Sequence, residues 1–308
     1  MGEFEYIAWL RQQARREPAR VDPRVLVGIG DDTAVLHPPA HPLLVTTDML
    51  LEGSHFVLSE AGPRRVGRKA LAVNLSDIAA MAGKPLAAVV SVGLPRGAGE
   101  SLATELYQGL REMADAFDTA LVGGDTNSWD GPLVISVTVF GEATGRGPVT
   151  RGGARPGDWL LVTGSLGGSI LAKHLDFTPR VREALVLHQQ ATLHAMIDIS
   201  DGLAADLKHI CDESGCGAVL RAEAIPISSA ARQTKDDRSA LEHALGDGED
   251  FELLFAVSPE DGRQLVQAQP VPGIMLTHAG ECIAESGLFL EEGGKRSALK
   301  PMGYIHSF

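Results

Sequence analysis

Aspartates recur at positions where a folded chain could gather side chains for chemistry. Asp48, Asp125 and Asp198 follow short apolar stretches, and Asp77 lies within an otherwise apolar segment. A buried carboxylate is costly unless it is paired, hydrogen-bonded or bound to a metal. Carboxylate oxygens without paired cysteines or histidines suit Mg²⁺ or Mn²⁺ better than Zn²⁺. For any one of these positions, a helix cap or a turn is the common alternative.

Local patterns place some of these aspartates beside other polar groups. In the strand expected over 195–199, alternation puts Asp198 on one face together with Ser200, and Asp201 follows. In the helix expected over 67–82, Asn74 and Asp77 share a face, and the mid-helix position of Asp77 excludes a capping role. These patterns predict oxygen-rich sites at strand ends and on one helix face.

Such oxygen ligands would allow an acidic protein to bind a polyphosphate through bridging metal ions. The motif GxxxxGK[ST] is absent, and Gly28-Ile29-Gly30 lacks the third glycine of a dinucleotide fingerprint and runs into Asp31 and Asp32. The loop Gly164–Gly168 follows an expected strand. Its main-chain N–H groups could bind phosphate, or the loop could be a plain turn.

Composition narrows the class of protein. The 308 residues include 27 Lys and Arg against 40 Asp and Glu, which gives a net charge of −13. That charge argues against binding nucleic acid or an anionic membrane. Three cysteines without a CxxC pair support neither a disulfide framework nor a structural zinc site. With no signal peptide and no long apolar run, we expect a cytoplasmic protein.

The order of expected elements indicates two domains of the α+β or α/β class. Helices are expected over 4–16, 67–82, 99–117 and 203–211, and strands over 25–30, 43–47, 86–94, 133–141, 158–163, 195–199, 252–257 and 273–277. Residues 142–157 are rich in Gly, Arg and Pro, so the domains are expected over 1–145 and 146–308. The polar stretch 228–239 is expected to be a loop.

An ordered set of motifs carries a resemblance to a known family. The motifs are Gly28–Asp32, Thr46–Asp48 with His55-Phe56, Ala70–Met81, Gly123–Thr126, Asp198–Gly202, Gly248–Leu253 and Gly303-Tyr304-x-His306. Together they resemble the thiamine-monophosphate kinases, within the aminoimidazole-ribonucleotide-synthetase-like superfamily. The resemblance runs from about residue 4 to the end of the chain. It implies a dimerising N-terminal domain with a mixed sheet, a C-terminal α/β domain, and a nucleotide bound between them.

The resemblance also implies an activity and roles for individual residues. The activity is the ATP- and Mg²⁺-dependent phosphorylation of thiamine monophosphate by direct in-line transfer, in a cytoplasmic homodimer. Asp77 and Asp125 would act in catalysis through metal ions, without a general base. The implied ligands of several Mg²⁺ ions are Asp32, Thr46, Thr47, Asp48, Asp77, Asp125, Asp198 and Asp201, with Asp31 as a neighbour. The implied ATP contacts are Gly124, Asp125, Arg151 and Ser200, and the implied substrate contacts are His55, Glu249 and Tyr304.

Some positions depart from the family pattern, and other functions compete with this one. Thr126–Gly131 differs from the usual Thr-Thr-Arg-Gly, Asp247 replaces a glycine, and the stretch 171–196 is short. One alternative is another ATP-dependent reaction of the superfamily, such as that of aminoimidazole ribonucleotide synthetase. The other alternative is a non-catalytic nucleotide-binding module. Turnover of ATP with thiamine monophosphate separates the kinase from both alternatives, and turnover with formylglycinamidine ribonucleotide separates the alternatives from each other.

Overall fold

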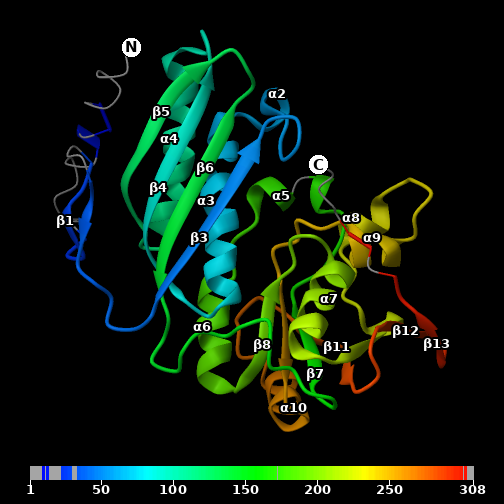
Figure 1. The fold of residues 1–308 in the computed structure, drawn as a ribbon. Helices are drawn as coiled ribbons and strands as arrows, with labels where there is room; N and C mark the ends of the chain where they lie inside the picture. The colour runs from blue at the N-terminus through cyan, green and yellow to red at the C-terminus, as the bar shows by residue number, and fades with distance from the viewer. Residues whose placement is uncertain are drawn as a thin grey trace. The chain divides into compact units, whose positions relative to one another are not determined.

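The chain divides into two units, each built around its own sheet (Figure 1). The computed structural model describes residues 9–10, 12–13, 22–29, 33–171, 173–300 and 302–303. Unit 1 comprises residues 1–78 and 84–147, and unit 2 comprises residues 79–83 and 148–308. Strands and helices occur in both units, which confirms the expected mixed fold class.

The elements of unit 1 precede most of those of unit 2 in the chain. The strands of unit 1 are β1 (Val25–Val27), β2 (Val35–Leu36), β3 (Leu43–Leu51), β4 (Lys84–Pro95), β5 (Ala120–Trp129) and β6 (Val134–Glu142). Its helices are α2 (Leu58–Ala61), α3 (Pro63–Ala80), whose last residues belong to unit 2, and α4 (Gly99–Ala116). The strands of unit 2 are β7 (Trp159–Thr163), β8 (Leu193–Asp198), β9 (Gly217–Arg221), β10 (Leu253–Val257), β11 (Leu276–Ile283), β12 (Leu288–Glu292) and β13 (Lys295–Ala298). Its helices are η2 (Ser169–Leu171), α5 (Lys173–Asp176), α6 (Val181–Gln190), α7 (Leu203–Ser214), η3 (Ala222–Ala224), α8 (Ser229–Gln233), α9 (Ala240–Gly246) and α10 (Pro259–Ala268).

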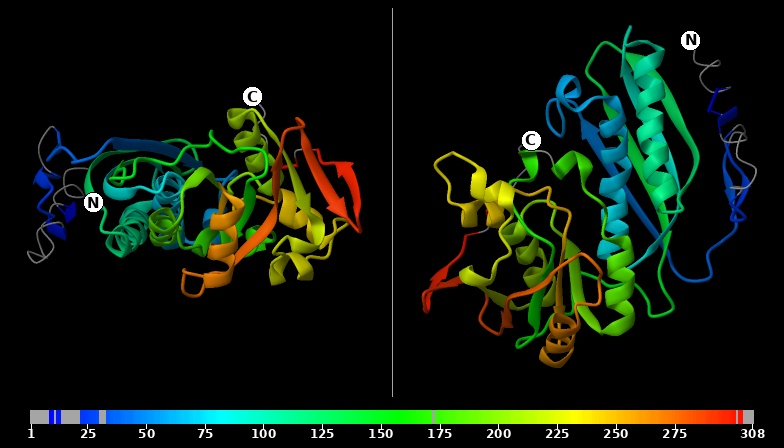
Figure 2. Two further views of the ribbon diagram at one scale, coloured as in Figure 1. Left: turned by 90° about the horizontal axis from the view of Figure 1, so that it is seen from below. Right: turned by 180° about the vertical axis from the view of Figure 1, so that it is seen from behind.

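The main sheet of unit 1 has the strand order β3-β6-β4-β5, with α3 and α4 on one face (Figures 1 and 2). Strand β6 shows why the helices lie there, because Ile135, Val137 and Val139 are buried while their neighbours are partly exposed. On β3 the opposite face is apolar as well, and Val45 and Met49 are more than half exposed. Unit 1 therefore buries one face of its sheet and leaves an apolar strip on the other.

Two glycines set the distance between α3 and α4. A Cβ atom at Gly67 would lie 2.1 Å from the Leu106 carbonyl oxygen, and one at Gly109 would lie 1.8 Å from the Arg64 carbonyl oxygen. Only glycine lets the two backbones approach this closely. The helix that carries Asp77 is thereby packed against α4 at backbone contact.

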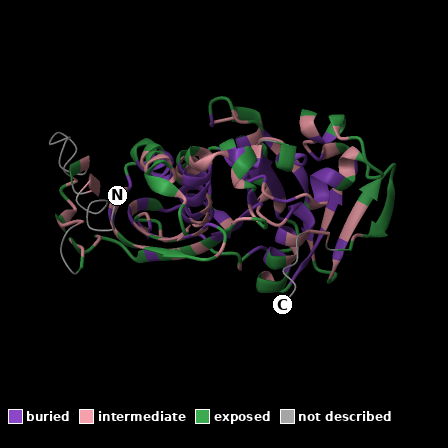
Figure 3. Ribbon diagram, turned by 90° about the horizontal axis from the view of Figure 1, so that it is seen from above, coloured by how far each residue is buried: buried purple, intermediate pink, exposed green. Residues whose placement is uncertain are grey.

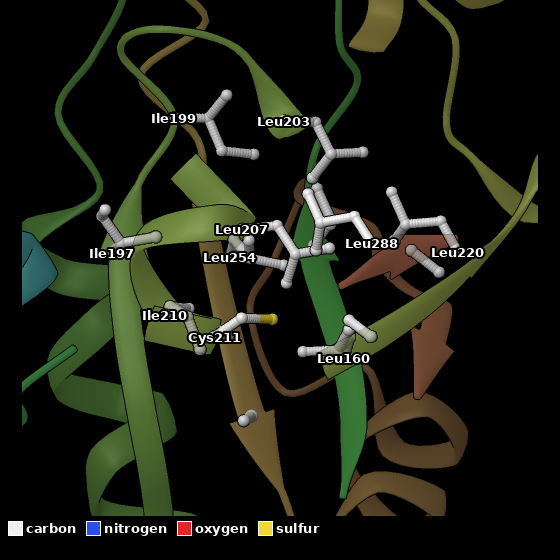
Figure 4. Packing of buried hydrophobic residues seen from close by; sticks show 14 of the residues in the cluster. Leu160, Ile197, Ile199, Leu203, Leu207, Ile210, Cys211, Leu220, Leu254 and Leu288 are labelled. Atoms are coloured by element: carbon white, nitrogen blue, oxygen red, sulfur yellow. The ribbon is translucent and has the colours of Figure 1, made fainter. Parts of the chain in front are cut away.

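Unit 2 contains a seven-stranded sheet of order β13-β12-β9-β11-β7-β10-β8. Alternate residues of its central strands, such as Leu160 and Leu254, pack against Leu207 of α7 in one apolar cluster (Figure 4). The free thiol of Cys211 lies in the same cluster. The edge strand β13 is exposed along its length (Figure 3). The core lies under α7, next to the loop that follows β8.

Several sequence expectations need correction. Strand β3 continues to Leu51 and β5 continues to Trp129, so Asp48 and Asp125 lie within strands and do not follow them. Asp48 in β3 and the run of glycine and polar residues from Gly123 in β5 broke the apolar pattern, so neither continuation was predicted. The stretch expected to be a loop over 228–239 contains α8, whose N-cap Ser228 accepts a hydrogen bond from the Ala231 N–H. Most of the helix expected over 4–16 lies outside the described residues.

No helix in the described part of the chain is both long and apolar enough to cross a lipid bilayer.

Candidate functional site

A pair of partly buried carboxylates lies on the helix-facing side of the unit 1 sheet. Alternation along β3 puts Thr46 and Asp48 on the same side as the buried Leu44 and Leu50. Asp77 reaches this side from α3, and the Thr46 hydroxyl donates a hydrogen bond to its carboxylate. Burial, followed by the charge of Asp77, raises the pKa of Asp48 to about 7. The pair therefore concentrates negative charge where a cation would be stabilised.

The structure does not bring the side chain of Thr47 to this pair. Its hydroxyl donates to the Val137 carbonyl oxygen at 3.1 Å and accepts from the Thr138 hydroxyl at 2.9 Å. By alternation it faces the other side of the sheet from Thr46 and Asp48. Thr47 could join a ligand set there only through a main-chain oxygen.

Gly124 and Asp125 lie on β5, at the opposite edge of the sheet from β3. Three strand spacings separate these edges, which is about 14 Å. A Cβ atom at Gly124 would lie 1.9 Å from the Val90 carbonyl oxygen, so this position requires glycine. Asn127 donates to the Asp125 carboxylate at 2.9 Å. Within unit 1, Asp125 is thus separate from the Asp48–Asp77 pair.

His55 lies just after β3, where the chain turns toward α2. Its Nδ1 accepts a hydrogen bond from the Leu51 N–H at 3.0 Å, so the neutral ring carries its proton on Nε2. The fully buried Lys69 donates from Nζ to the His55 carbonyl oxygen at 2.8 Å. These two contacts hold the ring and the main chain of His55 in place and leave the Nε2–H group as the donor of the ring.

In unit 2 the loop after β8 pairs with the segment before β10. Asp198 ends β8, and Ser200 and Asp201 precede α7. The Glu249 N–H donates to the Ser200 carbonyl oxygen at 2.7 Å. A Cβ atom at Gly248 would lie 2.6 Å from the same oxygen. Four of the residues predicted in unit 2 are therefore brought into one neighbourhood, namely Asp198, Ser200, Asp201 and Glu249.

Asp206 belongs to this neighbourhood and was not singled out from the sequence. Its carboxylate accepts hydrogen bonds from the N–H groups of Asp201 and Gly202, both at 3.1 Å. Burial, with the charges of Asp198 and Asp201, raises its pKa well above the usual range. An aspartate in the first turn of a helix is the signal that could have identified it.

Glu249 and Phe251 adopt left-handed backbone conformations, with φ of 51° and 49°. For residues other than glycine such conformations cost about 1–2 kcal/mol each. Strain of this kind persists where the surroundings enforce it, and it is common at ligand sites. The backbone of the Glu249 segment thus supports its assignment to the site.

The glycine loop 164–168 is a turn whose N–H groups are occupied by the chain itself. The Gly167 N–H donates to both carboxylate oxygens of Asp250 at 3.0 Å. The Gly168 N–H donates to Asp247 at 2.7 Å. Burial raises the pKa of Asp250 to about 6. Of the two readings of this loop, the structure supports the turn, because the chain's own carboxylates take the place of a phosphate.

Glu252 is a second residue that the sequence did not single out, and its partners give it a structural role. Its side chain is only 2% exposed and accepts two hydrogen bonds of 2.7 Å from Arg180. Lys173 Nζ and the Thr163 hydroxyl donate to it at 2.9 Å and 2.7 Å. Two cations and a hydroxyl therefore neutralise this buried carboxylate.

The remaining predicted residues are less informative. Arg151 lies in the exposed loop before β7, and its carbonyl oxygen accepts a hydrogen bond from the Ser214 hydroxyl at 3.3 Å. Asp31, Asp32 and Tyr304 lie outside the described residues. Among the described residues, no three His, Cys, Asp or Glu side chains form a ready metal-binding group.

Unit 1 also contains a pocket of about 420 Å³ that none of the predicted residues lines. Trp9 and Tyr107 meet there edge to face, with ring centroids 5.2 Å apart. Arg64 and Arg111 lie beside them, paired with Glu112 and Asp115. The pocket combines aromatic surface with charged groups, as small-molecule sites often do.

Comparisons with known proteins agree with this two-unit layout. The model of the AIR synthase related protein, N-terminal domain, matches residues 30–143, and that of the C-terminal domain matches residues 155–290. The thiamine-monophosphate kinase of Rhodopirellula baltica is 41% identical over 99% of this chain and 97% of its own length. That of Escherichia coli K12 is 35% identical over 99% and 98%.

Solved structures of thiamine-monophosphate kinases also match nearly the whole chain. The thiamine-monophosphate kinase of Stenotrophomonas maltophilia K279a is 35% identical, with a TM-score of 0.80 over 91% of this chain and 95% of that one. AaThiL complexed with AMPPCP and TMP is 31% identical, with a TM-score of 0.77 over 99% and 97%. The Escherichia coli hydrogenase maturation protein HypE is 19% identical with a TM-score of 0.76 and shares the fold. Since relatives more than 30% identical match nearly the whole chain, the chain belongs to the thiamine-monophosphate kinase family of AIR synthase related proteins.

Proposed function

We propose that this protein transfers the γ-phosphoryl group of ATP to thiamine monophosphate, which yields thiamine diphosphate and ADP. The observation that carries the proposal is the full-length match to thiamine-monophosphate kinases, at up to 41% identity. A relative that is 31% identical has been solved with AMPPCP and TMP bound. Both substrates of the proposed reaction are therefore represented in one relative of the same fold.

The attacking group in this reaction is a phosphate oxygen of the substrate. The second pKa of a phosphate monoester is about 6, so the oxygen is largely deprotonated at neutral pH. The chain then does not need a general base. Its task is to align two anionic groups and to offset their charge.

The oxygen-rich sites fit Mg²⁺, which prefers a few carboxylates together with substrate phosphates. Asp48 and Asp77 in unit 1, and Asp198 and Asp201 in unit 2, are the described carboxylates that would hold it, with Thr46 beside the first pair. The raised pKa of Asp48 indicates negative charge that a cation would stabilise. When bound, Mg²⁺ would offset phosphate charge during the transfer. We also assign Asp32, Thr47 and Asp125 to the metal ligands.

Further residues would bind the two substrates. We assign Gly124, Arg151 and Ser200 to ATP, and Arg151 can hold a phosphate through two parallel hydrogen bonds. We assign His55, Glu249 and Tyr304 to thiamine monophosphate, where a carboxylate and an aromatic ring suit a cationic heterocycle.

We further propose a cytoplasmic homodimer that pairs through the open face of the unit 1 sheet. Leu43, Val45 and Met49 on that side of β3 are more than half exposed. An apolar strip of this kind is typical of an interface. Pairing of two copies would cover it.

The direct test measures ADP release from ATP and Mg²⁺ with and without thiamine monophosphate, and identifies the product by chromatography. We expect turnover that requires both the substrate and Mg²⁺ and that chelation with EDTA abolishes. ATP binding without turnover, or turnover only with formylglycinamidine ribonucleotide, would contradict the proposal.

A further inference from the structure

A short segment of unit 2, residues 173–177, lies directly against the strained Glu249 loop. It consists of α5 and the next residue, Phe177. A four-residue helix is unstable by itself, so tertiary contacts must hold it. Three of these contacts go to residues of one short stretch, 249–252, and Lys173 Nζ also donates to the Ser165 carbonyl oxygen at 3.2 Å.

Each contact joins a different pair. Lys173 Nζ lies 2.9 Å from Glu252 Oε1. The ring of Phe177 stacks on that of Phe251, with centroids 3.9 Å apart and planes 16° from parallel. Between these two anchors, His174 Nδ1 lies 3.1 Å from Glu249 Oε2. The segment therefore contacts Glu249 itself and, just after it in the chain, Phe251 and Glu252.

The contact at His174 has a defined polarity. An ionised carboxylate only accepts hydrogen bonds, so Nδ1 carries the proton and donates. The neutral Nδ1–H tautomer and the imidazolium ion both supply that proton, so the contact holds in either state. His174 and Phe177 are buried, which limits the positions that the ring can adopt.

We propose that His174 is a positioning residue that orients the Glu249 carboxylate toward the cationic heterocycle of the substrate. The inference rests on the proposed function, in which Glu249 contacts thiamine monophosphate. Lys173 and Phe177 hold α5 in place, and His174 transmits that position to the carboxylate. Its effect is on affinity for the thiamine substrate and not on affinity for ATP.

The test compares two amide variants of His174 in the full-length protein. In His174→Asn the amide nitrogen can stand where Nδ1 stands, so the donor to Glu249 is kept. In His174→Gln the amide nitrogen stands near the position of Nε2, so the donor is misplaced. We expect His174→Gln to raise KM for thiamine monophosphate about tenfold, as loss of one hydrogen bond to a charged group does. We expect His174→Asn to stay within about threefold of wild type.

Three further readouts separate positioning from a general structural effect. For both variants we expect KM for ATP to stay within about twofold and kcat to change little. In a Glu249→Ala background, His174→Gln should add little to KM, because the carboxylate that His174 orients is absent. The matched control is His278→Gln in the same unit, whose ring stacks on Trp159 at 3.7 Å and which should leave both KM values unchanged.

Equal effects of the Asn and Gln variants, or equal changes in the two KM values, would overturn the positioning role. So would wild-type KM for thiamine monophosphate in His174→Gln. Thermal melting of each variant shows that it is folded. A wild-type protein without turnover would overturn the proposed function together with this inference, whereas active wild type with unaffected variants overturns this inference alone.

Discussion

Two buried acidic groups, one in each unit, are built in opposite ways. In unit 2, Glu252 lies between Arg180, Lys173 and the Thr163 hydroxyl, which together neutralise it. In unit 1, the pKa of Asp48 is raised by burial and by another carboxylate, that of Asp77. In the first arrangement, side chains of the protein itself neutralise the carboxylate. The second would gain stability from a cation supplied from outside, as the proposed metal site requires.

This difference separates structural from functional acids better than burial does. Both kinds of carboxylate lie in or beside motifs of the family, and both are shielded from solvent. A carboxylate that is neutralised within the chain holds elements together. A carboxylate that lies beside a like charge raises the free energy of the folded state, and such pairs are common at functional sites. Substituting each acid with its amide tests whether the two acids differ in role.

The largest expected effect is on turnover. Asp77→Asn should lower kcat by about 10³-fold or more, because one ligand of the proposed metal site is lost. The fold should persist, since an amide oxygen can still accept the hydrogen bond from the Thr46 hydroxyl. Steady-state ADP release and thermal melting measure the two effects. Asp118→Asn, at an exposed position of the same unit with φ of 50°, is the control and should behave as wild type. Wild-type turnover in Asp77→Asn would contradict the metal assignment.

The second effect is on stability. Glu252→Gln should lower the free energy of unfolding by about 3 kcal/mol, because Arg180 and Lys173 lose their buried counter-charge. Urea denaturation measures it. Asp212→Asn, which disrupts the exposed pair with Lys208, is the matched control and should produce no measurable change. If the two variants were equally stable, Glu252 would not be the structural centre described above.

The smallest effect is on the pH dependence of stability. The folded pKa of Asp48 is about 7, above the value of 3.8 for an unperturbed group, so the folded state holds the proton more tightly. The contribution of this group is fully present below about pH 4 and is lost as pH rises through 7. Mg²⁺ should therefore raise the melting temperature more at pH 8 than at pH 5. Asp48→Asn should remove most of that difference, and an unchanged difference in this variant would show that Asp48 does not titrate as described.

The sequence predicted elements best where one pattern was strong. The apolar periodicity of 67–82 and 99–117 located α3 and α4 within a few residues, and the mid-helix position of Asp77 followed from it. Strand ends were less predictable. Asp48 and Asp125 looked like residues after strands, because the apolar pattern stops at or just before each of them although the strand continues.

The parts of the site that the sequence did not predict depend on distant partners. Glu252 and Arg180 are 72 positions apart in the chain, so no local sequence pattern predicts their contact. The left-handed backbone of Glu249 is equally hidden, because non-glycine residues seldom adopt it. Asp247 departs from the family glycine, and only the structure shows that it binds the Gly168 N–H and His243.

The crossing of α3 and α4 has a consequence for how this protein can vary. At Gly67 and Gly109 even one added methyl group would collide with the backbone of the facing helix. Any replacement must push the helices apart, and Asp77 would move with α3 because it lies ten positions beyond Gly67. In a saturation mutagenesis screen, these two positions should therefore be as intolerant as the aspartates of the proposed metal site, although neither glycine has a functional group.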